Sequence, residues 1–384
     1  MSTFPHGRSS SRMHVVATRE SSIGELRAAL VPDSVEELVS DGFDVSVQSG
    51  IGSGAGFSDQ AYADAGATLE GDVSTLLNRA DIALHVRRPD PEAIADLKEG
   101  AVHISFLDPF QETELVGAMA RQGLVAVSLE MVPRSTRAQK MDALSSQASL
   151  AGYAAAVTAA HHLPRIFPMM MTPAGTLSPA RVFVIGAGVA GLQAIATAHR
   201  LGARIEAFDT RPVVAEEVRS LGAKFVDIDI GETEQTEQGY ARELSPEQIE
   251  MQQRGMAAVI ARSDVVITTA QVFGRPAPRI VTRDMVKAME ATSVVVDMAV
   301  ESGGNVEGSV LNKVVDVDGV RVIGFGNLPS HVATHASEMY SSNLLHFIRE
   351  FRVEDTNTIN LDPENDIVKA CVITRNGQVL HKPK

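Results

Sequence analysis

The stretch RVFVIGAGVAGLQAIATAHRLGARIEAFDT, residues 181–210, constrains the fold of this chain most strongly. Its β-branched run at 182–185 predicts a buried parallel strand, which leads into a GxGxxG pattern and an alanine-rich helix. The glycines are Gly186, Gly188 and Gly191. We expect the first to allow a tight turn, the second to admit a pyrophosphate, and the third to let helix and strand pack closely. A second strand ends at Asp209, whose carboxylate would accept hydrogen bonds from an adenosine ribose.

This order of strand, glycines, helix, strand and acid predicts a dinucleotide site, the alternative being a glycine-rich turn without a ligand. The binding segment would also include Val189, Ala190, Thr210 and Arg211. A carboxylate at position 209 favours a free 2′-hydroxyl and repels a 2′-phosphate, so we expect NAD(H) rather than NADP(H). We interpret Arg211 as a solvated turn residue, because Asp209 already holds the ribose position.

Composition excludes several classes of protein. The 384 residues carry 34 Lys and Arg against 48 Asp and Glu, and the net charge of −14 argues against nucleic acid or anionic lipid as partners. A single cysteine, Cys371, excludes an intrachain disulfide framework. No apolar run reaches the length of a membrane span, and residues 1–12 lack the apolar core of a secretory signal, so we expect them to form a mobile tail. Because His161 and His162 are adjacent and point in different directions, we predict no metal site.

Short apolar runs alternate with helical segments along most of the chain. We expect strands at 14–18, 43–48, 82–86, 102–106, 125–129, 265–269, 294–298 and 320–324, and helices at 31–40, 146–161 and 336–351. This alternation predicts an α/β protein with two Rossmann-like, doubly wound parallel sheets and a cleft between the domains. We place the first domain at 1–145 plus 331–384 and the NAD(H)-binding domain at 146–330.

The loop PRSTRAQKMDALSSQASLAGY at 133–153 lies at the expected domain junction and is rich in polar side chains. These side chains are Arg134, Arg137, Gln139, Asp142, Ser145, Ser146 and Gln147. Such groups can fix a nicotinamide carboxamide and its ribose. A polar surface loop with a helix cap at Ser145 or Ser146 would use the same residues, and residue chemistry alone leaves both interpretations open.

The segment PRSTRAQKMDALSSQ resembles the nicotinamide-side loop of the NAD(H)-binding component of the proton-translocating NAD(P) transhydrogenases. These belong to the wider alanine dehydrogenase/transhydrogenase family. The similarity extends to 167–203, 267–289, 294–305 and 326–330, and covers nearly the whole chain after residue 13, with the first domain diverging most. The loop is a specific marker, because related alanine dehydrogenases do not carry it.

The resemblance implies a homodimer that binds NAD(H) between two domains and passes hydride directly to NADP⁺ on a partner component. It implies a catalytic set in which Arg134 and Ser145 hold the nicotinamide carboxamide and Asp142 orients Arg134. Gln139 would reach towards the NADP(H) ribose, and Tyr240 matches a tyrosine on a mobile loop that closes over NAD(H). Direct hydride transfer requires positioning from the chain and no general acid or base.

The resemblance also implies partners and a location. A membrane subunit would couple the reaction to proton movement, and this chain would be active only with its partners. It would be peripheral, held at the cytoplasmic face of the membrane by the membrane and NADP(H)-binding subunits. An arm from the second domain is expected at the dimer interface, with 220–250 or 300–320 as candidate residues.

Two alternatives remain. An alanine dehydrogenase would share the fold but needs a clamp for the substrate carboxylate and a proton-transfer group. Arg27 matches the clamp arginine, but Asp108 stands near the place of the expected histidine while His103 lies in the strand, and Glu301 replaces an expected aspartate. A non-catalytic NAD(H)-sensing subunit is the other alternative, and the intact polar set at 134–145 argues against it.

Overall fold

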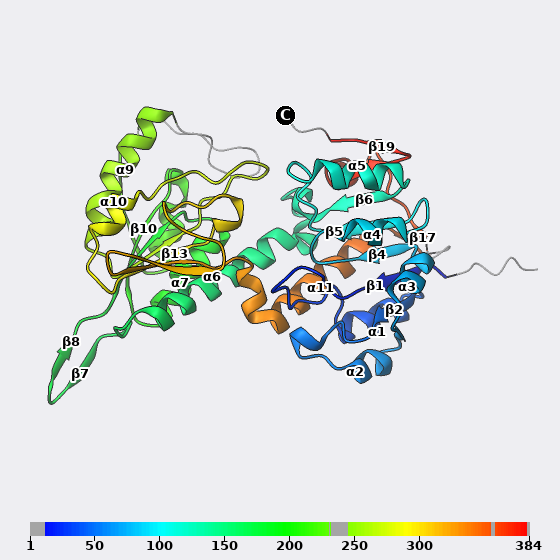
Figure 1. The fold of residues 1–384 in the computed structure, drawn as a ribbon, viewed down its shortest axis with the longest axis horizontal. Coiled ribbons are helices and arrows are strands. Elements are labelled where there is room, and N and C mark those ends of the chain that lie inside the picture. The colour runs from blue at the N-terminus through cyan, green and yellow to red at the C-terminus, as the bar shows by residue number, and fades with distance from the viewer. Residues whose placement is uncertain (1–11, 230, 232–244, 355–357, 382–384) are drawn as a thin grey trace, which may run out of the picture. The chain divides into compact units, whose positions relative to one another are not determined.

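The computed structural model describes residues 12–229, 231, 245–354 and 358–381, so the expected tail lies almost entirely outside the described residues (Figure 1). The chain divides into two compact units, Met1–Leu144 with Ala333–Lys384, and Ser145–Val332. Each unit contains one extended, mainly parallel sheet. The predicted α/β class with two mainly parallel sheets is confirmed.

The sheet of the first unit has the strand order β19-β18-β6-β5-β4-β1-β2-β3. Its parallel strands are β1 (His14–Ala17), β2 (Asp44–Gln48), β3 (Thr68–Glu70), β4 (Ile82–Leu84), β5 (Val102–Ser105) and β6 (Val125–Ser128). The antiparallel edge consists of β18 (Val372–Arg375) and β19 (Gln378–Val379). The helices of this unit are α1 (Pro32–Ser40), α2 (Asp59–Asp64), α3 (Val73–Arg79), α4 (Pro91–Ala95), α5 (Thr113–Arg121), α11 (Ala333–Phe351) and α12 (Asp366–Cys371). A short ladder joins β16 (Arg352–Val353) to β17 (Thr358–Ile359).

The sheet of the second unit has the order β11-β10-β9-β12-β13-β15-β14. Its parallel strands are β9 (Arg181–Ile185), β10 (Arg204–Phe208), β11 (Lys224–Phe225), β12 (Val265–Thr268), β13 (Val294–Asp297) and β15 (Val320–Gly324). The edge strand β14 (Lys313–Val317) is antiparallel. The helices are α7 (Val189–Arg200), α8 (Ala215–Ser220), α9 (Pro246–Ala261) and α10 (Arg283–Lys287), together with most of α6 (Ala143–His162). The strand order reverses between β9 and β12, which makes their carboxyl ends a topological switch point.

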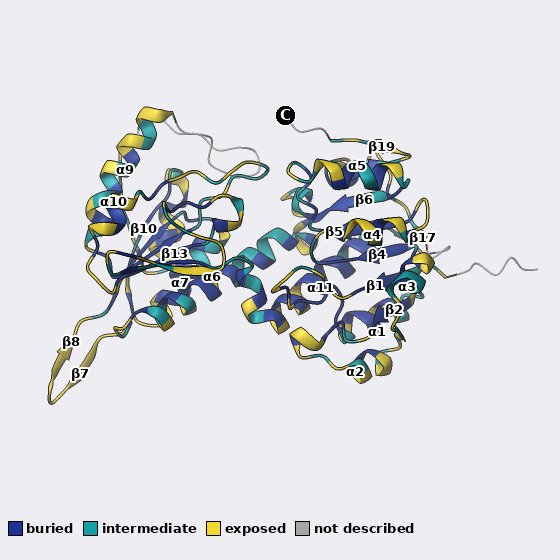
Figure 2. Ribbon diagram, in the orientation of Figure 1, coloured by how far each residue is buried: buried dark blue, intermediate teal, exposed yellow. Residues whose placement is uncertain are grey.

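Both sheets are buried on two faces, and the side chains of each strand alternate between two cores. Val182 and Val184 of β9 belong to one apolar cluster of the second unit, whereas Phe183 and Ile185 belong to the other. Figure 2 shows the central strands of both large sheets in the colour of buried residues. This burial explains why the strands appear in the sequence as continuous apolar runs.

Two tight turns add antiparallel strands that we did not predict. Asp318 and Gly319 join β14 to β15, and Asn376 and Gly377 join β18 to β19, all four with positive φ. Asp-Gly and Asn-Gly are the preferred pairs for type I′ turns of two-residue hairpins. The signal was therefore present in the sequence.

A third hairpin projects from the second unit, between α6 and β9. It pairs β7 (Met170–Thr172) with β8 (Gly175–Leu177), and all six of these residues are exposed (Figure 2). It lies outside both ranges that we considered for a dimerisation arm. Within the described residues, none of the helices combines the length and apolar character that crossing a bilayer requires.

Candidate functional site

The glycine-rich turn between β9 and α7 is shaped by contacts that a side chain would disrupt. Gly186 has φ +97°, and a Cβ there would lie 2.4 Å from Thr269 Oγ1. A Cβ on Gly191 would lie 1.9 Å from the carbonyl oxygen of Gly186. By contrast, a Cβ on Gly188 would meet nothing within 4 Å, and this residue caps α7 without a side-chain hydrogen bond. The turn therefore presents open backbone at a helix N-terminus, which is the geometry that binds phosphates.

The first turn of α7 contains the other two residues predicted here, Val189 and Ala190. Val189 is exposed, and Ala190 is partly buried. A Cβ on Gly152 would lie 2.1 Å from the Ala190 carbonyl oxygen, so α6 packs directly against this turn. The turn is thus fixed from two sides, by α6 and by the loop after β12.

The loop after β12 touches the glycine-rich turn at the switch point. Thr269 donates a hydrogen bond from Oγ1 to the Gly186 carbonyl oxygen at 3.1 Å, and its N–H donates to the Ile185 carbonyl oxygen at 2.9 Å. Ligands of open α/β sheets bind outside the carboxyl ends of the strands at such a point. The residues at 269–271 therefore border the crevice in which a dinucleotide would lie.

Asp209 follows β10 and has only 6% of its side chain exposed. Its carboxylate accepts the N–H of Ala187 at 2.7 Å and that of Arg211 at 2.9 Å, which ties the end of β10 to the glycine-rich turn. The Arg211 guanidinium also donates to both carboxylate oxygens, from Nε at 2.9 Å and from Nη2 at 2.8 Å.

Our interpretation of Arg211 as a solvated turn residue is therefore wrong. Only 15% of its side chain is exposed, because the two-residue spacing lets the guanidinium fork onto the Asp209 carboxylate. The hydrogen bond from Arg211 to Asp209 raises the pKa of the guanidinium further. Asp209 is thus a paired acid, and a ribose hydroxyl would share its oxygens with Arg211.

A cavity of about 380 Å³ lies beside the end of β10. Its lining residues are Phe208, Asp209, Thr210, Pro212, Phe225, Asp227, Ile228, Asp229 and Gly231. Phe208, Phe225 and Ile228 offer apolar surface, which suits a flat base. Three lining carboxylates surround that surface, and sequence reasoning missed two of them, Asp227 and Asp229.

The residues predicted for the nicotinamide side lie around η3 (Gln139–Met141). Arg134 and Gln139 are exposed, and Asp142 at the C-cap of η3 is partly buried. Ser145 lies in the first turn of α6 and is partly buried. The boundary between the units falls between Leu144 and Ser145, so the structure brings Arg134, Gln139 and Asp142 into the first unit and Ser145 into the second.

Helix α11 anchors the loop that carries these residues. Asn343 donates from Nδ2 to the Lys140 carbonyl oxygen at 2.8 Å, and Glu350 accepts a hydrogen bond from Arg137 Nε at 2.6 Å. Ala138 is buried in the core of the first unit. The anchors lie about 200 residues away in sequence, and no local signal could have identified them. Tyr240 lies outside the described residues.

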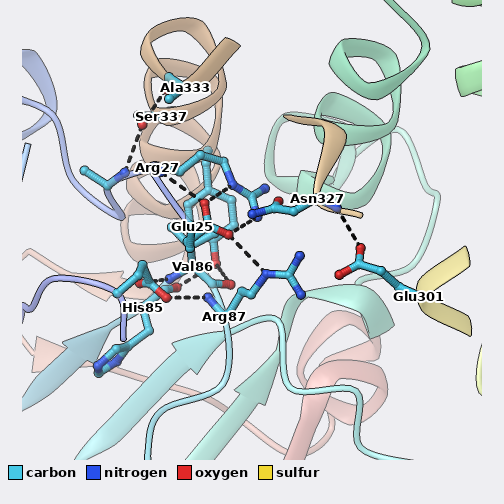
Figure 3. A network of polar contacts seen from close by, with 12 residues as sticks. Glu25, Arg27, His85, Val86, Arg87, Glu301, Asn327, Ala333 and Ser337 are labelled. Carbon is cyan, nitrogen blue, oxygen red and sulfur yellow. Dashed lines mark hydrogen bonds and ion pairs between the residues drawn. The ribbon is translucent and has the colours of Figure 1, made fainter. Parts of the chain in front are cut away.

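A charged network occupies the carboxyl edge of the sheet in the first unit (Figure 3). Glu25 accepts hydrogen bonds from Arg27, through Nε at 2.8 Å and Nη2 at 2.6 Å, and from Arg87 Nε at 3.1 Å. Burial alone would raise the pKa of Glu25, but its bonds to Arg27 and the charges of both arginines lower it to about 2. Glu20 accepts the N–H groups of Val86 and Arg87, while burial raises its pKa to about 7. The arginine that matches a substrate clamp is thus held by a buried carboxylate.

The two histidines near this edge are core residues. His103 in β5 is fully buried, with Nε2 at 3.1 Å from His85 Nδ1, and His85 Nε2 lies 2.8 Å from Thr18 Oγ1. Burial lowers the pKa of His85 to about 4 and that of His103 well below its ordinary value. Both rings are therefore neutral near pH 7 and enclosed in protein, where a substrate cannot exchange protons with them.

Asp108 and Glu301 stand at the other two positions where an alanine dehydrogenase is expected to have a histidine and an aspartate. Asp108 follows β5 with φ +45°, and burial raises its pKa. In the second unit, Glu301 accepts the N–H of Asn327 at 3.0 Å through Oε2 (Figure 3). Glu301 thereby holds the loop after β15.

Comparisons with known proteins place these features in context. The family described as "Alanine dehydrogenase/PNT" matches with its N-terminal domain at 16–151 and its C-terminal domain at 155–382. An NAD(P) transhydrogenase alpha subunit of Rhodospirillum rubrum is 42% identical over 376 residues, covering 96% of this chain and 98% of that protein. A crystal structure of transhydrogenase from Sinorhizobium meliloti superposes with a TM-score of 0.86 at 45% identity, covering 95% of this chain and 99% of that one. An alanine dehydrogenase of Halomonas elongata is 29% identical over 343 residues, covering 88% of this chain and 86% of that protein.

Proposed function

The chain belongs to the alanine dehydrogenase/PNT family, and we propose that it is the NAD(H)-binding alpha subunit of an NAD(P) transhydrogenase. The open backbone at Gly188, beside Asp209 and the carboxylate-lined cavity, is the observation that carries this proposal. The pyrophosphate would lie on the N-terminus of α7, and the adenosine would enter the cavity with its ribose against Asp209. Val189, Ala190, Thr210 and Arg211 would line this half of the site.

The lining of the cavity supports NAD(H) rather than NADP(H). A 2′-phosphate would bring about two negative charges next to Asp209, Asp227 and Asp229. The nearby cations among the described residues are Arg211, Arg219, whose guanidinium lies 6.0 Å from the centroid of the Phe225 ring, and Lys224, which pairs with Glu206. The Arg211 guanidinium already donates to Asp209 at two points. Repulsion by the carboxylates would therefore select the nucleotide with a free 2′-hydroxyl.

On the nicotinamide side, Arg134 and Ser145 would bind the carboxamide, and Asp142 would orient Arg134. Gln139, exposed on η3, would reach the NADP(H) ribose on the partner component. A hydride with its electron pair passes from C4 of NADH to C4 of NADP⁺, giving NAD⁺ and NADPH without gain or loss of a proton. The chain contributes by fixing one ring at reacting distance, which is worth several kcal/mol of the barrier.

The assembly proposed is a homodimer held at the cytoplasmic face of the membrane by a proton-translocating subunit and the NADP(H)-binding component. We expect the exposed hairpin of β7 and β8 to contact a second copy of this chain. Met170 and Met171 are 44% and 74% exposed, and methionines adapt well to apolar partners. Replacing both by Asp should convert a dimer to monomers in light scattering, whereas Leu380→Asp, an exposed apolar residue of the first unit, should leave it dimeric. A monomeric unmodified chain would contradict this role.

An alanine dehydrogenase is not favoured by the site. Its clamp arginine would have to leave Glu25, and His103 is enclosed in the core. The exposed, anchored positions of Arg134 and Gln139 also have no task in a sensing subunit. Both alternatives remain outcomes of the experiment below.

The test measures NADH oxidation coupled to NADP⁺ reduction, with and without an NADP(H)-binding component of a transhydrogenase. We expect transfer only with the partner present. Gln139→Asn should slow that transfer about tenfold or more with the Kd for NADH unchanged, because the residue acts across the interface. Partner-independent oxidation with pyruvate and ammonia would instead indicate an amino-acid dehydrogenase, and tight NADH binding without transfer would indicate a sensor.

A further inference from the structure

Asp297, the last residue of β13, and Asn305, in the loop that follows, form a fully buried polar pair. The Asp297 carboxylate accepts the N–H groups of Ala299 at 3.0 Å and of Asn305 and Val306 at 3.1 Å. Gly304, with φ +84°, lets the loop close over this carboxylate, because a Cβ there would lie 2.7 Å from Asp297 Oδ2. The loop after β13 is therefore wrapped around one buried acid.

The side chain of Asn305 then holds the neighbouring loop after β12. Its Oδ1 accepts the N–H of Ala270 at 3.1 Å, and its Nδ2 donates to the carbonyl oxygens of Ala270 and Pro278 at 2.8 Å each. An amide is required here, because only an amide both donates and accepts in this geometry. The Asn305 side chain thus hydrogen-bonds to the backbone of the loop after β12, as the backbone of an adjacent strand would.

This loop is the one that touches the glycine-rich turn. Thr269 donates to the Gly186 carbonyl oxygen, and a Cβ on Gly186 would come within 3.5 Å of the Ala270 nitrogen. A continuous set of contacts therefore runs from Asp297 through Asn305 and Ala270 to Gly186. It spans the carboxyl ends of β9, β12 and β13, which border the crevice at the switch point.

We propose that Asn305 is a positioning residue for the dinucleotide, holding residues 269–271 against the glycine-rich turn so that the nicotinamide half of NADH enters a crevice of fixed width. This inference rests on the NAD(H) site proposed above. It assigns Asn305 no contact with the reacting atoms. Its effect passes through the backbone at Thr269 and Ala270.

The test compares variants of the full chain by fluorescence titration with NADH, by calorimetric titration with 5′-AMP, and by thermal unfolding. Asn305→Asp keeps the size but replaces two donated hydrogen bonds with repulsion between oxygens, and should raise the Kd for NADH about tenfold. The Kd for 5′-AMP should stay within about twofold, because the adenosine half binds beside β10. Thr269→Val, at a partly buried position, should raise the Kd for NADH about threefold and keeps the proposal testable if Asn305→Asp does not fold.

Asp264→Asn is the matched control at the opposite edge of the same sheet. Asp264 is also buried and accepts a backbone N–H, from Arg181 at 2.7 Å, but it precedes β12. This control should lower the melting temperature while the Kd for NADH stays within about twofold of the unmodified chain.

Three results would overturn the inference. The first is an unchanged Kd for NADH in both Asn305→Asp and Thr269→Val. The second is an equal loss of affinity for NADH and for 5′-AMP. The third is a loss of affinity that follows the fall in melting temperature in all variants, including the control. If the unmodified chain does not bind NADH, the proposed function itself fails. The two failures are therefore distinguishable.

Discussion

In the first unit, the loops after β1 and β4 meet through charged side chains. In the second unit, the loops after β9 and β12 meet through backbone groups and the uncharged hydroxyl of Thr269. Glu25, Arg27 and Arg87 fill the first edge with paired charges. At the second edge, glycines bring peptide groups together and leave the N-terminus of α7 open at Gly188. Two sheets of the same fold class thus differ in what their carboxyl edges offer a ligand.

This difference indicates which edge of a doubly wound sheet can bind a nucleotide. Paired arginine and glutamate side chains satisfy one another, and a phosphate would have to displace a buried carboxylate from Arg27. Unpaired N–H groups at a helix N-terminus need no such displacement. The predictions below test whether the two edges are as independent as this comparison implies.

The largest expected effect is at Gly191. Gly191→Ala places a Cβ against the Gly186 carbonyl oxygen, which should destabilise the protein by about 3 kcal/mol and abolish detectable NADH binding. Gly188→Ala is the control, since open space surrounds that position: its stability should change by less than about 1 kcal/mol, while the Kd for NADH rises about tenfold. Urea unfolding and NADH titration measure both. Normal NADH binding by Gly191→Ala would refute the packing argument.

The next largest effect concerns the filled edge, which is the carboxyl edge of the first unit's sheet with its paired Glu25 and Arg27 side chains. Glu25→Gln leaves the Arg27 guanidinium, 4% exposed, without its carboxylate and should lower the free energy of unfolding by about 3 kcal/mol. Binding of 5′-AMP to the folded variant should be unchanged, because the adenosine half would lie in the second unit. Calorimetry with 5′-AMP and urea unfolding are the measurements. A weakened affinity for 5′-AMP would show that the edges are coupled.

Glu25 should also make the stability of the folded chain depend on pH. The pKa of Glu25 is lowered from 4.5 to about 2 on folding, so its stabilisation is complete above about pH 4.5 and is lost as pH falls towards 2. Urea unfolding between pH 3 and 6 should show stability falling more steeply with acid in the unmodified chain than in Glu25→Gln. Parallel profiles for the two proteins would contradict the assigned pairing.

The smallest effect concerns nucleotide choice at the open edge. Replacing Asp227 and Asp229 together by Asn should reduce the ratio of the Kd for NADPH to the Kd for NADH about threefold, because both carboxylates are exposed and partly screened by solvent. Asp318→Asn, an exposed acid in the turn between β14 and β15, should leave the ratio unchanged. An equal change in both variants would indicate net charge rather than the cavity as the cause.

Sequence patterns predicted most of the parallel strands, because buried strands leave continuous β-branched runs. The parallel strands β3 and β11 were missed, since they are short and contain no fully buried residue. The run at 265–269 corresponds to β12 (Val265–Thr268), and the run at 320–324 to β15 (Val320–Gly324). We overlooked the antiparallel edges because Asp318-Gly319 and Asn376-Gly377 were not weighed as hairpin turns. The hairpin of β7 and β8 has no buried face, so periodicity could not identify it.

The site was predictable only to a limited extent. The glycine spacing located the turn, but the fork of Arg211 onto Asp209 depends on side-chain geometry that spacing does not fix. The anchor of Asn343 on Lys140 and the contact of Asn305 with Ala270 join residues far apart in sequence. Such contacts follow from the topology and not from local composition.

The most direct test of the account is hydrogen–deuterium exchange of the full chain with and without NADH. We expect added protection of backbone amides at 186–192 and 207–211, where the open turn and Asp209 lie, and at 269–271. Amides at 20–27 and 85–88, around the filled edge, should exchange equally in both states. Protection of the filled edge with none at the glycine-rich turn would contradict the central claim that the open edge of the second unit binds the dinucleotide.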